Sequence, residues 1–183
     1  MIEFQKRGLP HAHILLWINP ADKPTTPEHV DSIVCAEIPD RHSDPKLFDI
    51  VTKCMLHGPC GPADPNCGCM KNKNNKCRFR YPKPYVDNTT VDEDGKATYR
   101  RRDIKEREVL MQVRLSSGKS AKYKFTNQHV VPYNKGILLK YNCHINVEIC
   151  TGIFYMNTLY IYMLLKRCML IKNCNISIDL QTI

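Results

Sequence analysis

The chain of 183 residues is long enough for one domain, or for one domain with a small appendage. Its 43% apolar and 25% charged residues exclude an intrinsically disordered protein. The formal net charge of +9 fits either a soluble surface or a partner rich in phosphate, and charge alone does not separate the two.

Two strands are expected at the start of the chain, over residues 2–5 and 11–18. Residues 6–10 form the turn between them, because Gly8 and Pro10 interrupt the pattern. The second strand ends in a nearly continuous apolar run, which favours a central strand covered on both faces.

A paired-histidine metal site is predicted in this second strand. His11 and His13 are two residues apart, so both imidazoles point to one face and could hold one divalent cation. Glu3 and Gln5 share a face of the preceding strand, and one of them could approach the same metal. The alternative is a strand with two incidental histidines.

Two short helices follow. Thr25 and Glu28 fit a capping box, and Pro27 suits the first turn of the first helix. Asp44 and Pro45 repeat the cap-and-proline pattern for the second helix, which ends before residue 58. Apolar residues at helical spacing follow both starts: Val30, Ile33 and Val34, then Leu47, Phe48, Val51, Cys54 and Met55.

Residues 57–85 are rich in Gly, Pro, Asn and Cys and show no periodicity. Such a loop cannot bury enough apolar area to hold a shape, so a structural metal is expected. His57, Cys60, Cys69 and Cys77 form a candidate tetrahedral Zn²⁺ site, with Cys67 as a competing ligand. The alternative is a loop with unligated thiols, which are expected to be reduced because the first residues do not resemble an export signal.

Two further strands are expected over residues 109–115 and 123–131, around a turn at residues 116–118. The turn resembles a phosphate loop, but Val113 stands where that motif needs glycine, so nothing supports ATP hydrolysis or a helicase. Arg100, Arg101 and Arg102 are candidate DNA phosphate contacts, with a solvated charged surface as the alternative. The apolar run of residues 149–165 is interpreted as core or a damaged segment, not a membrane span.

Several of these segments, in this order, resemble the Rep proteins of Helitron rolling-circle transposons, which are HUH (His-hydrophobic-His) endonucleases. The resemblance covers about residues 2 to 150 and is carried by six motifs: EFQKRGLPHAHIL (3–15), AEIPD (36–40), HGPCG (57–61), YRRRD (99–103), VVPYN (130–134) and KYNCHINVE (140–148).

This resemblance implies an α+β fold, with an antiparallel HUH-type sheet, short flanking helices and the Cys-rich loop. It also implies a nuclear, non-membrane protein that nicks single-stranded DNA at transposon ends and transfers the strand. His11 and His13 would bind Mg²⁺ or Mn²⁺, with Gln5 as third ligand and Glu3 in reserve. A tyrosine would attack the DNA, leaving a 5′-phosphotyrosine and a free 3′-hydroxyl.

The nucleophile region departs from the family, which carries two tyrosines four residues apart in a helix. Those positions fall near Thr158 and Tyr162, so Tyr162 is the one candidate in register. Poor or absent nicking is therefore expected. The alternatives are a non-catalytic remnant that binds single-stranded DNA and a zinc-stabilised interaction module.

The sequence is accordingly divided into four segments. Residues 1–56 hold the metal-site hairpin and helices, and residues 57–85 the zinc-type loop. Residues 86–150 hold the strand-rich remainder, and residues 151–183 form a divergent tail with the character of a reading-frame shift. Upstream strands and the helicase domain of complete relatives are expected to be missing from this truncated copy.

Overall fold

The computed structural model describes residues 2–4, 10–22, 24, 26–70, 76–93, 96–150 and 158–164. In residues 2–4, 10–12, 17, 20, 150 and 158–164 the description is of the backbone. Gln5, the expected third ligand of the paired-histidine site, lies outside the described residues, as does most of the predicted divergent tail.

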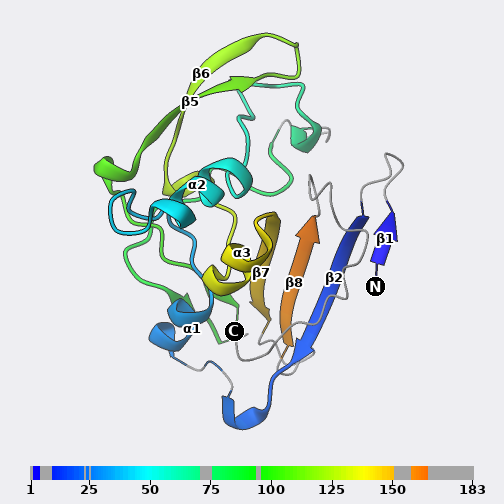
Figure 1. Ribbon diagram of the computed structural model, residues 1–183, viewed down its shortest axis with the longest axis vertical. Coiled ribbons are helices and arrows are strands. Elements are labelled where there is room, and N and C mark those ends of the chain that lie inside the picture. Colours follow the sequence, from blue (N-terminus) through cyan, green and yellow to red (C-terminus); the bar gives the residue numbers. More distant parts are fainter. Residues whose placement is uncertain are drawn as a thin grey trace.

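A four-stranded antiparallel sheet lies on one side of the molecule, in the order β1-β2-β8-β7 (Figure 1). Its strands are β1 (Ile2–Phe4), β2 (Pro10–Trp17), β7 (His144–Cys150) and β8 (Thr158–Leu164). The predicted N-terminal hairpin is confirmed, and β2 lies inside the sheet. The described part of the tail, β8, fills the position between β2 and β7, so this part of the tail belongs to the sheet.

Three α-helices are present among the described residues: α1 (Pro27–Ile33), α2 (Pro45–Cys54) and α3 (Lys135–Tyr141). Asp44 caps α2 as predicted, accepting the Leu47 N–H at 3.4 Å. The predicted cap of α1 is one residue too early. Thr26, not Thr25, is the N-cap, because its side chain accepts the His29 N–H at 3.2 Å and Pro27 is already helical.

The sheet is covered on one face by α1 and α3. Ile145, Val147 and Ile149 alternate along β7 and are buried against the apolar residues of these helices. Ile14 and Leu16 of β2 pack against the same cluster. Leu15, between them, is 48% exposed, so β2 is not covered on both faces as its apolar run suggested. In the part of the chain that the structure describes, the side of β2 that carries Leu15 is therefore the accessible face of the sheet.

A second apolar cluster joins α2 to α3 and to residues 130–133. Its most deeply buried members are Ile38, Val51, Met55, Val130, Tyr133 and Leu138. Packing in this cluster fixes the position of α2, and therefore of the Cys-rich loop that follows α2, relative to α3. The predicted apolar positions of both helices are buried, except Cys54, which is half-buried.

Short two-stranded sheets complete the architecture: β3 (Thr90–Val91) with β4 (Ala97–Thr98), and β5 (Val109–Arg114) with β6 (Ser120–Phe125). The second predicted strand was placed too late. It begins at Ser120 and ends at Phe125, because Thr126 caps a 3₁₀ turn over Asn127–His129. The remaining 3₁₀ turns are Pro20–Asp22, Gly68–Met70 and Lys105–Arg107. The predicted α+β class is confirmed.

Candidate metal centre and adjoining pocket

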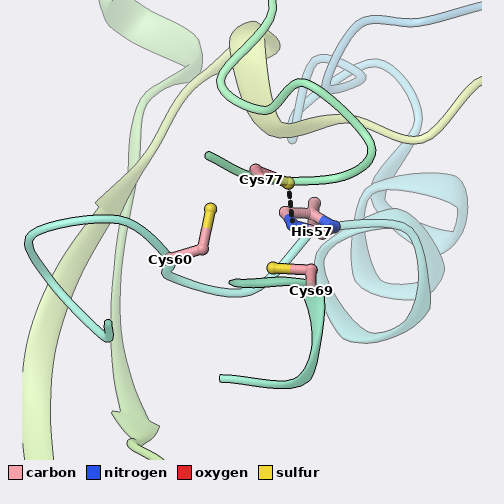
Figure 2. Close-up of side chains that lie close together, drawn as sticks. All are labelled: His57, Cys60, Cys69 and Cys77. Carbon is pink, nitrogen blue, oxygen red and sulfur yellow. Dashed lines mark hydrogen bonds between the residues drawn. The ribbon is translucent and has the colours of Figure 1, made fainter. Parts of the chain in front are cut away.

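Four side chains from the Cys-rich loop converge on one point. The ligand atoms of His57, Cys60, Cys69 and Cys77 all lie within 4.8 Å of one another. Figure 2 shows the three sulfurs and the imidazole turned toward a common centre. These are the four residues predicted from the sequence as a zinc set, and together they could hold a metal ion. Cys67 lies beside the set, with its sulfur 3.2 Å from that of Cys69.

One ligand-to-ligand distance in the cluster is close to that of tetrahedral zinc coordination. With Zn–S bonds near 2.3 Å and a Zn–N bond near 2.0–2.1 Å, the sulfur–nitrogen edge of the tetrahedron is about 3.6 Å. Cys77 Sγ lies 3.4 Å from His57 Nε2. The donor chemistry, one imidazole and three thiols, is that of structural zinc sites.

Backbone hydrogen bonds position the ligands. His57 follows α2, and its N–H donates to the His129 carbonyl at 2.8 Å. Cys69 lies in the 3₁₀ turn Gly68–Met70, and its carbonyl accepts the Arg78 N–H at 3.0 Å. The Cys77 carbonyl accepts the Arg80 N–H at 2.8 Å, which closes a tight turn directly after this ligand. The loop thus has local order in addition to its four ligands.

Burial and neighbouring groups shift the pKa values of the ligands in the cluster. Burial, assisted by the nearby positive groups His129 and Lys83, lowers the pKa of His57 to about 4, so its imidazole is neutral at neutral pH. Burial raises the pKa of Cys60 to about 11, and the neighbouring Cys77 adds to this effect. Burial also opposes ionisation of Cys77, but hydrogen bonds from the Tyr81 and Phe79 backbone outweigh it and lower the pKa of Cys77. A bound cation would stabilise all three thiolates.

The seven cysteines whose side chains the structure describes are free thiols. Cys35, Cys54 and Cys143 lie away from the cluster, in or beside the two apolar clusters. Among the described residues the His57 cluster is the one group of three or more potential ligands close enough to share an ion.

A pocket of about 940 Å³ opens beside the cluster. Its lining joins the accessible face of the sheet to the end of the Cys-rich loop. The sheet contributes His13, His144, Asn146 and Glu148, and the loop contributes His57 and residues from Arg78 to Pro84. Five cations line it (Arg78, Arg80, Lys83, Lys96 and Arg101) against one carboxylate, Glu148.

Polar side chains on β7 are held in place at the pocket floor. The His144 ring donates through Nδ1 to the Cys54 carbonyl at 2.7 Å, which leaves Nε2 as its basic nitrogen. The Asn146 amide donates to Glu148 at 3.0 Å. The Asn146 Oδ1 atom is buried and has no hydrogen-bond partner in the described part of the chain. The floor therefore offers nitrogen and oxygen groups of fixed orientation.

The predicted nuclease residues lie on neighbouring strands. His13 is the Cα partner of Tyr162 on β8, and Tyr162 is the Cα partner of Asn146 on β7. Glu3 on β1 is the Cα partner of His11. Tyr162 thus lies in a strand, whereas the family resemblance implied a helix for the nucleophile. The roles of His11, His13, Glu3 and Tyr162 remain predictions, and so does Mg²⁺ or Mn²⁺ binding.

The three consecutive arginines all have partners within the chain. Arg101 is buried and donates to the Asn127 and Val130 carbonyls at 2.8 and 2.7 Å. Arg102 forms paired hydrogen bonds with Glu37 at 2.9 and 2.7 Å, and Arg100 lies 3.3 Å from Asp31. These contacts hold the arginine segment against α1 and against the segments that contain Glu37 and Asn127. Contact of the arginines with DNA remains a prediction.

Sequence reasoning missed two parts of the pocket. One is the polar floor on β7, and the other is the basic wall formed by Arg78, Arg80 and Lys83. The floor has a sequence pattern, since polar and apolar residues alternate over residues 144–149, as in a strand with one covered face. The wall also has one, since cations alternate with aromatic residues directly after Cys77.

Comparison of the chain with protein-family models finds no matching family, and comparison with curated protein sequences finds no similar protein. None of the helices in the described part of the chain is long and apolar enough to cross a membrane.

Proposed function

We propose that this chain is a nuclease domain of the Helitron Rep, HUH type, that nicks single-stranded DNA poorly because its nucleophile region is altered, with a structural zinc at His57, Cys60, Cys69 and Cys77. One observation supports it most strongly. A single pocket joins His13, from the predicted histidine pair, to a wall of lysine and arginine side chains. Metal-dependent cleavage of DNA needs both a cation-binding face and a surface that attracts phosphate.

The charge balance of the pocket supports a polyanionic ligand. Five cations line it against one carboxylate, and Arg78 and Arg80 are exposed. Positive charges on a concave surface focus the field and concentrate a phosphate chain there. Phosphate contacts supply much of the affinity of any nucleic-acid-binding protein, so this wall is the proposed DNA-binding surface.

The strand register supports the cleavage chemistry, because Tyr162 is the Cα partner of His13. Mg²⁺ or Mn²⁺ held by His11 and His13, with Gln5 or Glu3, would polarise the scissile phosphate. The phenol oxygen of Tyr162 would form the new bond to phosphorus as the bond from phosphorus to the 3′ oxygen breaks. The phenol proton would pass through solvent to the leaving 3′ oxygen, giving a free 3′-hydroxyl and a 5′-phosphotyrosine.

The second candidate is a single-strand DNA-binding domain without nicking activity. The observation that favours it is the strand conformation of Thr158–Leu164, since the family nucleophiles lie in a helix. Both candidates share the basic pocket and the zinc cluster, and they differ in the competence of Tyr162.

Covalent capture separates the two. The zinc-loaded chain is incubated with Mn²⁺ and 3′-labelled single-stranded DNA from the transposon end, and labelled protein is sought after denaturation. An adduct that disappears in Tyr162→Phe would establish nicking. Binding without an adduct would establish the second candidate, and failure to bind single-stranded DNA would contradict both.

The cation site has its own test. Mn²⁺ titration of the wild-type chain is compared with His11→Ala/His13→Ala, and His42→Ala serves as the control because His42 is exposed and outside the pocket. Loss of both imidazoles should weaken Mn²⁺ binding by at least about tenfold, since even groups behind the ligands typically affect affinity this much. Equal Mn²⁺ binding by all three proteins would contradict the assignment.

A further inference from the structure

The segment that leaves the metal cluster alternates cations with aromatic rings. After the buried ligand Cys77 come Arg78, Phe79 and Arg80, all exposed, and then Tyr81 and Lys83. Phe79 is 49% exposed, which makes it one of the few large apolar side chains left open to solvent among the described residues. An aromatic ring kept in solvent among cations is the arrangement that proteins use to stack unpaired nucleobases.

The rings are held by the metal ligand itself. His57 stacks on Tyr81 with ring centres 4.2 Å apart and an angle of 12°. The edge of Phe79 meets His57 at 5.8 Å and 72°. The guanidinium of Arg78 lies over the Phe79 ring, 4.5 Å from its centre. Phe79 is thus fixed on one side by the cluster, and its exposed part carries a cation that can itself stack on a base.

The backbone of this segment has an uncommon conformation. Arg80 has φ of 59°, in the left-handed region that favours glycine. The turn is closed by the Arg80 N–H on the Cys77 carbonyl at 2.8 Å. Strained non-glycine residues are often found where a side chain must be presented to a ligand. Here Arg80 and Lys83 line the same pocket as His13.

We propose that Arg78–Lys83 forms a stacking clamp for single-stranded nucleic acid, in which Phe79 and Arg78 stack one base while Arg80 and Lys83 contact phosphates. The clamp rests on the proposed single-strand binding at this pocket and names the residues that carry it. A duplex keeps its bases stacked on one another, so the exposed ring selects a single strand. An acidic peptide would use the cations but leave the ring without a partner.

The test uses the zinc-loaded full chain and two probes of about 20 units, an oligothymidylate and a fully abasic oligonucleotide with the same phosphates. Phe79→Ala should weaken oligothymidylate binding by about 5- to 150-fold, the range expected for loss of one stacked base. Phe79→Trp should restore it. Neither variant should change binding of the abasic chain.

Zinc content is measured for each variant, so that loss of the cluster is not mistaken for loss of the clamp. Leu110→Ala is the matched control, because Leu110 is a 66% exposed apolar residue on β5, outside the pocket. Arg80→Gln and Lys83→Gln should each reduce the slope of log affinity against log salt by about 0.7, while Phe79→Ala leaves it unchanged.

The outcomes are distinct. If the wild type binds oligothymidylate and Phe79→Ala binds it equally well, the clamp is wrong and the proposed function stands. If the wild type binds neither probe, both proposals fail. Equal affinity of the wild type for the two probes, or equal competition by polyglutamate, would show a general polyanion surface and would also overturn the clamp.

Discussion

The sheet layer and the Cys-rich loop keep their shapes by different physical means. The sheet side of the molecule is held by apolar burial, with Ile145 and Val147 fully buried beneath α1 and α3. The described part of the loop from His57 to Cys77 has few buried apolar side chains, Met70 being one, and instead turns three thiols and an imidazole toward one centre. The sheet should therefore depend on packing, and the loop on a metal.

This difference matters because the proposed DNA surface spans both parts. His13 and Asn146 come from the sheet, whereas Arg78 and Arg80 come from the end of the loop. A change that affects one part alone should alter binding in a recognisable way. The predictions below separate the two parts, beginning with the largest expected effect.

Removal of zinc should release the loop and spare the sheet. Structural zinc contributes about 10–16 kcal/mol of apparent binding free energy in small zinc-dependent peptides, so the loop should lose its order without it. Hydrogen exchange should then show loss of amide protection over residues 57–81, with β7 still protected. Equal loss of protection in β7 would show that the two parts are one cooperative unit.

The ligand assignment is checked by elemental analysis. The wild-type chain purified without chelators should carry about one zinc, and Cys60→Ser/Cys69→Ser should carry almost none. Cys67→Ser is the matched control, because Cys67 is a neighbouring thiol outside the set of four. Zinc retained by the double variant, or lost from Cys67→Ser, would refute the assignment.

A cavity in the apolar core beneath the sheet should lower the free energy of unfolding without affecting the zinc site. Ile145→Ala removes a fully buried side chain and should lower the free energy of unfolding by about 2–5 kcal/mol. Zinc content should not change. Leu110→Ala, at a 66% exposed position, should cost about 0.5 kcal/mol or less. Denaturant unfolding of the zinc-loaded variants measures both, and loss of zinc from Ile145→Ala would contradict the separation of the two parts.

Loss of the Glu37 carboxylate should give a smaller, pH-dependent change in the free energy of unfolding. Glu37 is buried, which opposes ionisation, but hydrogen bonds and charge from Arg102 outweigh burial and lower the pKa of Glu37. The ionised carboxylate therefore stabilises the fold above the ordinary glutamate pKa of about 4.3, and this contribution is lost as pH falls through the lower folded value.

Glu37→Gln should accordingly cost about 1–3 kcal/mol near neutral pH, a range reduced for the partial exposure of its arginine partners. The difference from wild type should shrink as the solution is acidified below about pH 4. Urea unfolding at several pH values measures it. A difference that is constant with pH would show that the charge of Glu37 is not the source of its contribution.

Much of the fold follows from local patterns in the sequence. Helical spacing of Val30 and Ile33, and the Asp44 cap with Pro45, predict α1 and α2 because those signals are short-range. The position of β8 between β2 and β7 could not be predicted, since strand order depends on pairing between distant segments. The accessible face of β2 was missed for a related reason: an apolar run does not reveal what covers it.

The site was predictable where chemistry limited the choices. Four N and S ligands in a loop with little core predicted the cluster at His57, Cys60, Cys69 and Cys77, and the structure places these four together. The pocket was not predictable, because His13, Glu148 and Arg80 are far apart in sequence and meet through tertiary packing. The arginines at 100–102 carry no local sign of a partner in the sequence, but Arg102 pairs with Glu37, 65 residues away, and Arg101 donates to Asn127, 26 residues away.

The most direct test of the proposed function measures single-stranded DNA affinity against salt for the zinc-loaded and zinc-free chain. Because Arg78 and Arg80 are held by the cluster and His13 by the sheet, binding should need both parts in place. The prediction is binding by the zinc-loaded chain that weakens steeply as salt rises, and loss of most of that affinity when zinc is removed. An affinity that does not vary with salt, or that is the same without zinc, would contradict it.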